Sequence, residues 1–377
     1  MTMTVHDFSD DTTLTDRMVR FGAELYRGDD NWIAPFQSSL REQLSPSYRF
    51  CRKPGNDRMN FVAMDGGKTV GHAAAMVNAD LRETDGAVGT VGFFECVDHY
   101  AVAEKLFTAA IDWLRRVHGI TRVWGPMNFD IWHDYRMMTR GFDRPVFYGE
   151  PYNKPYYPGF FERYGWRPKR NWESVEVIGD AIEQLITWGT PRYQDFVANG
   201  YRFDKFDNAR FDSELTRLYG ALTESFSGFF GFTPITIDEF VAMFSKLKYA
   251  LDPRLFTFVT DPRGELAGFA GAFLDLSAAV RAMRGQTSIC ARLRFIMRRR
   301  RVDRLVFYII GLSAREAARQ TGLGSAAVCH VTQSLHTLGY RSMVAALMPQ
   351  DGRSRGLVGG RDAMPAQREY TLYEIEI

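Results

Sequence analysis

Three side chains of the sequence could move a proton during a reaction. Glu95 ends an apolar strand, and the hydrophobic neighbours in 93–96 would raise its pKa toward neutrality. A half-buried carboxylate with satisfied hydrogen bonds is the structural alternative. His133, followed directly by Asp134, is a candidate base with an orienting carboxylate on a loop. Tyr308 lies within a predicted strand and could give a proton to a leaving group, although alternate residues of that strand belong to the core.

The sequence shows no pattern of a nucleophile triad or of a metal site. The seven histidines have no HxxxH or HxxEH spacing, and the four cysteines lie far apart without a CxxC pair. We therefore expect free thiols in a reducing compartment, no metal, and direct group transfer without a covalent enzyme intermediate.

A glycine-containing loop in the second half could bind a diphosphate. Its glycines allow close approach of the backbone to a ligand, and the helix that follows presents N–H groups with partial positive charge. Such a loop is a weak signal in a chain with 33 glycines, so the surrounding elements must support it. The loop consists of Arg319, Gln320, Thr321, Gly322, Leu323, Gly324 and Ser325.

The elements around this loop have the order that a phosphate site needs. An apolar run, Leu305–Leu312, predicts a buried strand, and apolar residues spaced by three and four predict a helix over 325–338 that ends at Gly339. Residues Ser342 to Met348 predict the next strand. A strand–helix–strand crossover with an ordinary glycine turn and no ligand is the alternative.

The first half repeats this order of elements. A hairpin around Asp65-Gly66-Gly67, a strand at 88–96, a helix at 101–117 and a strand at 122–124 precede a link that contains Trp188-Gly-Thr-Pro191 as a break. The second half repeats the series at 255–260, 266–273, 305–312 and the helix after the loop. We infer an internal duplication whose first copy lacks the glycine loop.

The pattern of strand, Arg319-x-x-Gly322-x-Gly324, helix and strand, followed by Asp351-x-Arg353-Ser354 and a final strand at 369–377, resembles the acyl-CoA-binding core of the GNAT superfamily of N-acyltransferases. The segment at 313–318 is expected to be a loop, and it departs from the family, which usually has a proline and a tyrosine–arginine pair there. The resemblance implies acyl-CoA as co-substrate and a diphosphate held by Arg319–Ser325. It also implies that pantetheine lies along Ile310, Gly311 and Leu312.

The Gly-Pro-Met-Asn segment at 125–128 and the PYNKPYY segment at 151–157 resemble a two-domain bacterial GNAT subgroup with a degenerate N-terminal copy, and the bacterial ceramide synthases have this two-domain look. The fold class implied is α/β (α+β), with tandem GNAT-like domains, each a mixed, mostly antiparallel sheet flanked by helices. The expected boundaries are 1–180 for the degenerate domain, 181–211 for a linker and 212–377 for the acyl-CoA-binding domain. Substrate contacts are expected from Asn128, Asp134, Tyr152, Asn153, Tyr156 and Tyr157.

A basic insert at 274–304 interrupts the second copy. On a helix, Ile289, Leu293, Ile296 and Met297 would share one face, and Phe295 would lie on the charged side. The pattern suits an anionic membrane surface or an amphiphilic substrate; a nucleic-acid contact and a solvated face packed on its own domain stay open. Its arginines are Arg281, Arg284, Arg292, Arg294, Arg298, Arg299, Arg300, Arg301 and Arg304, against the acids Asp275 and Asp303.

Composition bounds the remaining choices. A chain of 377 residues that is 45% hydrophobic and 14% aromatic predicts a globular protein of two domains, and a net charge of only +2 gives no general argument for nucleic acid. The polar N-terminus lacks a signal-peptide pattern, so we expect a cytoplasmic protein, with peripheral contact at the inner membrane face as an open alternative.

Three hypotheses of function follow. The first is an N-acyltransferase that moves an acyl group from acyl-CoA or acyl carrier protein to a primary amine, with a lipophilic amine such as a sphingoid base as acceptor. The second is a non-catalytic membrane-surface or regulatory module on the same scaffold. The third is an aminoacyl-tRNA-dependent transferase whose arginines contact RNA.

Overall fold

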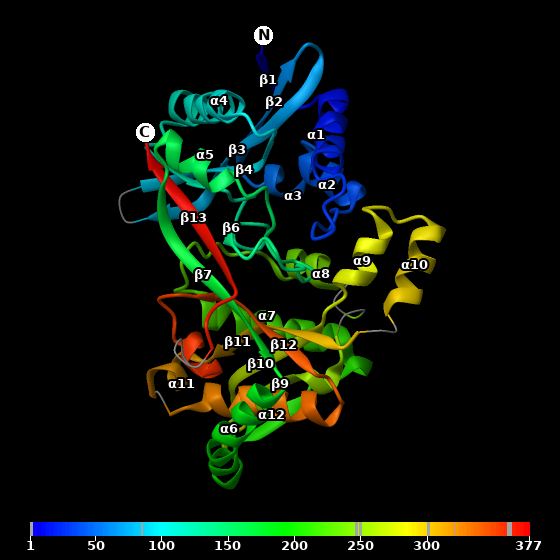
Figure 1. Ribbon diagram of the computed structural model, residues 1–377. Helices are drawn as coiled ribbons and strands as arrows, with labels where there is room; N and C mark the ends of the chain where they lie inside the picture. The colour runs from blue at the N-terminus through cyan, green and yellow to red at the C-terminus, as the bar shows by residue number, and fades with distance from the viewer. Residues whose placement is uncertain are drawn as a thin grey trace. The chain divides into compact units, whose positions relative to one another are not determined.

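The computed structural model describes residues 3–83, 86–245, 248, 251–299, 302–319, 321–359 and 364–377. The chain forms two compact units (Figure 1). Unit 1 comprises Met1–Asn171, Ser277–Arg298 and Glu369–Ile377, and unit 2 comprises Trp172–Leu276 and Arg299–Arg368.

Unit 1 is built on a mixed sheet in the order β1-β2-β3-β4-β5-β13, with β6 paired to β13. Only the β4–β5 pair is parallel among the described pairings of this unit. The β2–β3 hairpin turns at Gly66 and Gly67, whose φ values of 54° and 79° are the left-handed values that the sequence predicts for this turn. The strands are β1 (Thr4–Phe8), β2 (Asp57–Asp65), β3 (Lys68–Glu83), β4 (Gly86–Cys96), β5 (Arg122–Gly125), β6 (Met137–Arg140) and β13 (Arg368–Glu376).

Both faces of this sheet carry a hydrophobic core because successive strand residues point to opposite sides. On β2, Phe61 and Ala63 pack with α4, whereas Val62 packs with Met18 of α1. The helices of unit 1 are α1 (Thr12–Leu25), α2 (Gln37–Leu44), α3 (Arg49–Arg52), α4 (Tyr100–His118), α5 (Tyr157–Tyr164), α9 (Ser277–Met283) and α10 (Ile289–Arg299).

Unit 2 repeats the arrangement with the strand order β7-β12-β11-β10-β9-β8, in which β11 and β12 are parallel. Helices α6 and α12 pack closely, since a Cβ on Gly189 would lie 2.6 Å from the Cβ of Cys329. The strands are β7 (Arg167–Ile178), β8 (Arg202–Lys205), β9 (Phe256–Thr260), β10 (Leu266–Leu274), β11 (Arg304–Leu312) and β12 (Ser342–Pro349). The helices are α6 (Asp180–Ala198), α7 (Phe211–Phe226), α8 (Ile237–Phe244), α11 (Ala314–Arg319) and α12 (Leu323–Thr337), with 3₁₀ turns η1 (Asn208–Arg210), η3 (Pro253–Leu255) and η4 (Arg353–Val358).

The two units confirm the duplicated α/β architecture, but their boundaries differ from those that the sequence indicates. The expected linker at 181–211 is occupied by α6 and β8 of unit 2, and Pro191, expected in a break, lies inside α6. The last residues of β7 pair with β12 in unit 2, while β13, from the end of the chain, pairs with β5 in unit 1. Residues 277–298 of the basic insert belong to unit 1 although the flanking strands belong to unit 2.

Candidate functional site

The parallel strands β11 and β12 of unit 2 separate partway along their length. They pair only from Arg304 to Phe307 and from Ser342 to Ala345. Tyr308 is then an extra residue in β11, because Phe307 pairs with Ala272 and Ile309 with Gly271, and its side chain is 46% exposed. Such a β-bulge twists the strand. Residues 309–312 continue along β10, so the edge of β11 that faced β12 is left for another partner.

The residues expected to face pantetheine lie in this separated part of β11. Ile310 and Leu312 are partly buried, and Gly311 is buried. The carbonyl oxygen of Leu312 accepts a hydrogen bond of 2.9 Å from the Ser225 hydroxyl of α7. The strand end is therefore apolar, with one carbonyl already paired.

The predicted glycine loop leads into the N-terminus of α12. Gly322 is the residue that precedes the helix, and its φ of 87° is a left-handed value that glycine adopts without steric cost. The atoms nearest to a Cβ on Gly324 would be side-chain atoms of Leu357 and Ile310, at 3.5 and 3.7 Å. The first amide groups of any helix lack intrahelical acceptors and favour an anion. Gln320 lies outside the described residues.

Arg192 of α6 approaches the same loop, and sequence reasoning missed it. Its Cδ lies 3.1 Å from the position that a Cβ on Gly322 would occupy, and its guanidinium is 5.0 Å from the centre of the Trp188 ring. The Arg319 side chain is 52% exposed and lies 3.3 Å from Glu316. Arg192 thus places a guanidinium at the start of α12, and Arg319 precedes this start in the chain.

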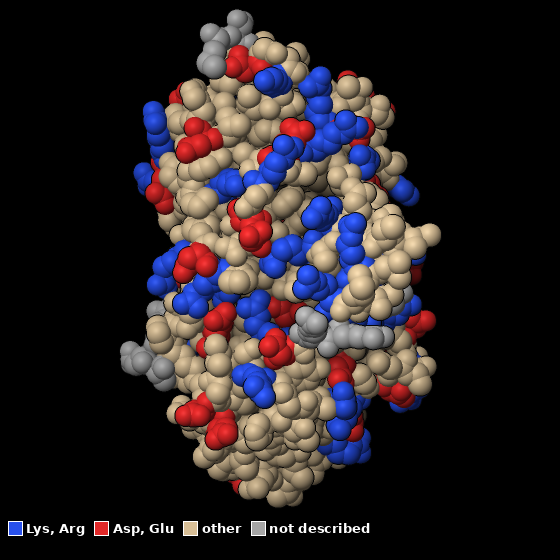
Figure 2. All heavy atoms as spheres, turned by 45° about the vertical axis from the view of Figure 1, so that its right-hand side comes forward, with Lys and Arg blue, Asp and Glu red and all other residues tan. Residues whose placement is uncertain are grey.

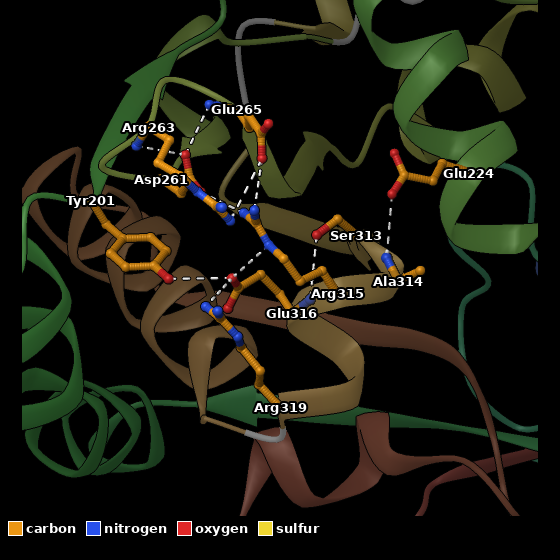
Figure 3. A network of polar contacts seen from close by, with 10 residues as sticks. All are labelled: Tyr201, Glu224, Asp261, Arg263, Glu265, Ser313, Ala314, Arg315, Glu316 and Arg319. Atoms are coloured by element: carbon orange, nitrogen blue, oxygen red, sulfur yellow. Dashed lines mark hydrogen bonds and ion pairs between the residues drawn. The ribbon is translucent and has the colours of Figure 1, made fainter.

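The segment expected as a loop at 313–318 is instead a short helix, α11, held by an ion-pair network (Figure 3). Arg315 pairs with Asp261 and, at 2.7 Å, with Glu265. The buried Glu316 carboxylate accepts a hydrogen bond of 3.3 Å from the Tyr201 hydroxyl and pairs with Arg319. Because the Asp261 and Glu316 side chains are almost fully buried, these contacts fix the direction in which α11 leads to the glycine loop.

In unit 1 the corresponding opening between β4 and β5 is filled by the chain itself. The Phe93 N–H donates to Oδ1 of Asn128 at 2.7 Å, and the Met127 N–H donates to the Val91 carbonyl at 3.0 Å. A Cβ on Gly92 would lie 2.4 Å from Asn128 and from the Met127 carbonyl. Asn128, predicted to contact substrate, therefore uses its side-chain oxygen to close this strand edge.

Glu95 lies at the end of β4 between two tyrosine hydroxyls. Oε2 of Glu95 accepts hydrogen bonds of 2.5 Å from Tyr157 and 3.0 Å from Tyr26. Burial raises the pKa of Glu95 to about 7, opposed by these two hydrogen bonds and by the Lys154 charge. The carboxyl can therefore exchange a proton near neutral pH, as its apolar neighbours suggested. Its catalytic role stays a prediction.

Tyr26 and Lys154 complete the surroundings of Glu95, and sequence reasoning selected neither of them. The Lys154 ammonium lies 4.4 Å from the centre of the Tyr26 ring and 3.6 Å from the Asp29 carboxylate. Lys154 lies within the PYNKPYY segment, next to residues that the sequence predicts to contact substrate. This position is the sequence signal that could have identified it. Tyr26 ends a helix some seventy positions before Glu95 and carries no local signal.

The other residues of the PYNKPYY segment differ in burial: Asn153 is buried, whereas Tyr152 and Tyr156 are partly buried. Asn153 is buried and hydrogen-bonds both backbone groups of Met138, at 2.7 and 3.2 Å. The Tyr156 hydroxyl donates to the Cys96 carbonyl at 2.8 Å, and the Tyr152 hydroxyl donates to Asp29 at 3.0 Å. Asn153 thus has a structural place, whereas Tyr152 and Tyr156 lie beside the Glu95 cluster.

His133 is oriented by Asp130 and not by Asp134, contrary to the sequence-based expectation. Its Nδ1 lies 2.6 Å from Oδ1 of Asp130, and its Nε2 lies 2.8 Å from the Tyr48 hydroxyl. A separation of three residues lets the loop turn the two side chains toward each other, which adjacent residues rarely achieve. Asp134 is exposed, and its backbone carbonyl accepts the Asn128 N–H.

Among the described residues, no group of three or more His, Cys, Asp and Glu side chains could hold a metal ion. No helix of the described chain is both long and apolar enough to cross a membrane.

Comparisons with known proteins agree with this fold. No protein-family model matches the sequence. A tandem GNAT protein from the clavulanic acid biosynthesis pathway has a TM-score of 0.54 at 11% identity, covering 99% of this chain and 98% of that one. The bacterial ceramide synthase of Caulobacter vibrioides (strain NA1000 / CB15N) is 27% identical over 72% of this chain and 70% of its own length. Protein YghO of Escherichia coli (strain K12) is 27% identical over 61% of this chain and 58% of its own, so the match spans little more than half of that relative.

The chain therefore has the tandem GNAT fold, as its sequence patterns imply. The Caulobacter relative is named a bacterial ceramide synthase, and the tandem GNAT protein shares the fold of this chain. The donor, the acceptor and the reacting residues are matters of proposal.

Proposed function

We propose that the protein is an N-acyltransferase that moves an acyl group directly from a thioester of coenzyme A or acyl carrier protein to a primary amine. The observation that carries the proposal is the separation of β11 from β12 in unit 2, followed by the glycine-led start of α12. In this proposal Ile310, Gly311 and Leu312 line the pantetheine, and Arg319–Ser325 contact the diphosphate.

The residues of this region fit such a ligand. Gly324 is buried, but the nearest atoms, from Leu357 and Ile310, leave ordinary van der Waals room for a Cβ. The amides at the start of α12 suit a phosphate oxygen. Arg192 adds positive charge next to Gly322, and Arg319 lies three residues before Gly322 in the chain. Guanidinium groups bind phosphate through charge-assisted hydrogen bonds.

Transfer to an amine joins nitrogen to the thioester carbonyl carbon and breaks the carbon–sulfur bond, so the amine loses a proton and the thiolate gains one. We assign proton acceptance to Glu95 because its pKa of about 7 leaves a substantial ionised fraction at neutral pH. His133, paired with Asp130 and Tyr48, is the second candidate base. Tyr308, exposed at the β11 bulge, is the proposed donor to the leaving thiolate.

A lipophilic amine such as a sphingoid base is the proposed acceptor. The relative that supports this choice is named a bacterial ceramide synthase, and it matches 72% of this chain at 27% identity. We propose Tyr152 and Tyr156 as acceptor contacts, since both hydroxyls lie beside the Glu95 cluster.

Calorimetric titration with acetyl-CoA, palmitoyl-CoA and palmitoyl acyl carrier protein tests the donor site. Gly324→Trp should abolish binding of the preferred thioester, because the indole would fill the space at the start of α12. Gly220→Trp, at an exposed α7 position where a Cβ would meet no atom within 4 Å, is the control for added bulk and should bind normally. Because Gly324 is buried, circular dichroism must show that Gly324→Trp is folded. The absence of binding to all three thioesters would overturn the proposal in favour of a non-catalytic module. If the protein binds a thioester, its rate of amide formation with a sphingoid base and with a short polar amine then identifies the acceptor class.

A further inference from the structure

Helix α10 exposes an apolar face. Ile289, Leu293, Ile296 and Met297 are 77%, 55%, 53% and 65% exposed, and all four belong to one helix of 11 residues. Large apolar side chains gathered in this way are unusual on a monomeric protein surface and mark an interaction site. In Figure 1, α10 (yellow) is drawn with no labelled element on its outer side.

The opposite face of α10 packs on the protein. Ala291 is buried and Phe295, one turn later, is partly buried. At about 100° per residue these two positions are centred about 180° from the four exposed apolar residues. The sequence predicted that Phe295 lies on the charged side of the helix. In the structure Phe295 lies on the packed face instead.

Three arginines border the exposed apolar face on both sides. Arg292 and Arg299 lie about 85° and 105° from its centre in one direction, and Arg294 lies about 115° away in the other. Arg298 is exposed too, about 155° from the centre. The helix contains no Asp or Glu. Elsewhere on the face drawn in Figure 2, basic and acidic side chains are interspersed. Long arginine side chains beside an apolar strip can reach lipid phosphates while the strip enters the acyl region.

The segment that carries α10 is fixed to unit 1. The Gln37 N–H at the start of α2 donates to the Gly285 carbonyl at 3.1 Å, and the Arg281 guanidinium donates to the Asn31 carbonyl at 3.5 Å. A Cβ on Gly285 would lie 2.7 Å from the Pro35 carbonyl, so the two segments are in close contact. These contacts attach the segment just before α10 to unit 1, and the apolar face of α10 is exposed.

We propose that α10 binds the surface of an anionic lipid bilayer, lying in the interface with Ile289, Leu293, Ile296 and Met297 inserted. An 11-residue helix is too short to span the hydrocarbon layer, for which about 20 residues are needed. Nucleic acid would leave the four apolar side chains without a partner. An acidic protein with an apolar groove could bind the same face, and lipid-dependent flotation of the purified chain favours the membrane over it. The proposal is independent of the acyl-transfer proposal, since it concerns no residue of that site.

Vesicle flotation tests this surface with the full chain. Wild-type protein should float with phosphatidylglycerol-containing vesicles, bind pure phosphatidylcholine at least about tenfold more weakly, and lose binding as salt increases. Leu293→Ser with Ile296→Ser should weaken binding about tenfold or more. The matched control, Val117→Ser with Val197→Ser, changes apolar residues that are 60% and 47% exposed on other helices and should bind as the wild type does.

A charge variant separates the two contributions. Arg294→Ser with Arg298→Ser should weaken binding to anionic vesicles about tenfold but leave weak binding to neutral vesicles unchanged. All α10 variants should keep the wild-type circular dichroism spectrum, because the replaced side chains are exposed. No flotation of the wild type, or equal flotation of the serine variants, would overturn the proposal. So would concentration-dependent dimerisation that is lost with Leu293→Ser and Ile296→Ser in the absence of lipid.

Discussion

The Tyr157 hydroxyl donates a hydrogen bond of 2.5 Å to Oε2 of Glu95, and this carboxyl has a pKa of about 7 because it is buried. Two opposing effects meet at one oxygen. Burial favours the protonated acid, whereas the hydroxyls of Tyr157 and Tyr26 favour the carboxylate. The net result is that the pKa of this carboxyl in unit 1 is close to neutral pH.

Glu95 should make the stability of the protein depend on pH. Its pKa is raised from an ordinary 4.5 to about 7 in the folded state, so the unfolded chain ionises first as pH rises. The free energy of unfolding should therefore fall between pH 4.5 and 7 by about 2–3 kcal/mol from this group. Glu95→Gln should remove that part of the pH dependence in urea titrations at pH 5 and pH 8. Equal pH dependence in both proteins would contradict the assignment.

Tyr26→Phe should raise the pKa of Glu95 further, since one hydrogen bond to the carboxylate is lost. The measurement is a pH titration of the Glu95 carboxyl by carbon NMR, supported by the acidic limb of the acylation rate. Tyr219→Phe, which removes a hydroxyl bonded to the Ile235 carbonyl in unit 2, is the control and should leave the titration unchanged. A lower Glu95 pKa in Tyr26→Phe would show that the hydroxyl does not stabilise the charge.

Asp130→Ala should destabilise the protein by about 1–3 kcal/mol. The His133 and Asp130 side chains are only 6% and 8% exposed, so the substitution leaves a buried ring nitrogen without its partner. Asp112→Ala breaks pairs with Arg115 and Arg116 on the surface of α4 and should cost less than about 1 kcal/mol. Denaturant unfolding of both variants compares them, and similar losses would argue against the buried pair.

Substitutions at Arg315 and Arg319 should have different effects, the first on the stability of the protein and the second on thioester binding. Arg315→Ala leaves the buried Asp261 carboxylate without a cation partner in this helix and should cost about 2–3 kcal/mol in thermal or urea unfolding. Arg319 is 52% exposed, and without it Glu316 keeps its contacts with Arg315 and the Tyr201 hydroxyl. Arg319→Ala should therefore cost less than about 1 kcal/mol but weaken thioester binding about tenfold. Unchanged binding with Arg319→Ala would remove this residue from the proposed diphosphate site.

Gly92→Ala should destabilise unit 1 by about 1–3 kcal/mol, because its Cβ would lie 2.4 Å from Asn128 and from the Met127 carbonyl. Gly324→Ala in unit 2 should be tolerated, since the nearest atoms are 3.5 Å away. Thermal unfolding of the two variants compares the opening between β4 and β5, where the added Cβ would clash, with the start of α12, where it would make ordinary contacts. Full tolerance of Gly92→Ala would mean that the segment at 127–128 can move away from β4.

Much of the fold was open to prediction because its signals are local. The two glycines of the β2–β3 turn, the apolar run that became β11, and the three- and four-residue spacing in α12 each lie within a few residues of one another. The apolar side of α10 followed in the same way. The expected loop at 313–318 was wrong because the ion pairs of Arg315 and the burial of Glu316 stabilise a helix there.

By itself the sequence determined the duplicated order of elements, the glycine loop, and the apolar surroundings of Glu95. Only the tertiary structure decided which distant residues meet, because contacts between segments far apart in the chain depend on how the strands pair and pack. It paired β13 with β5, placed Tyr26 against Glu95, and turned His133 toward Asp130 instead of Asp134. It also assigned α10 to unit 1, where packing through Ala291 left its apolar face outward.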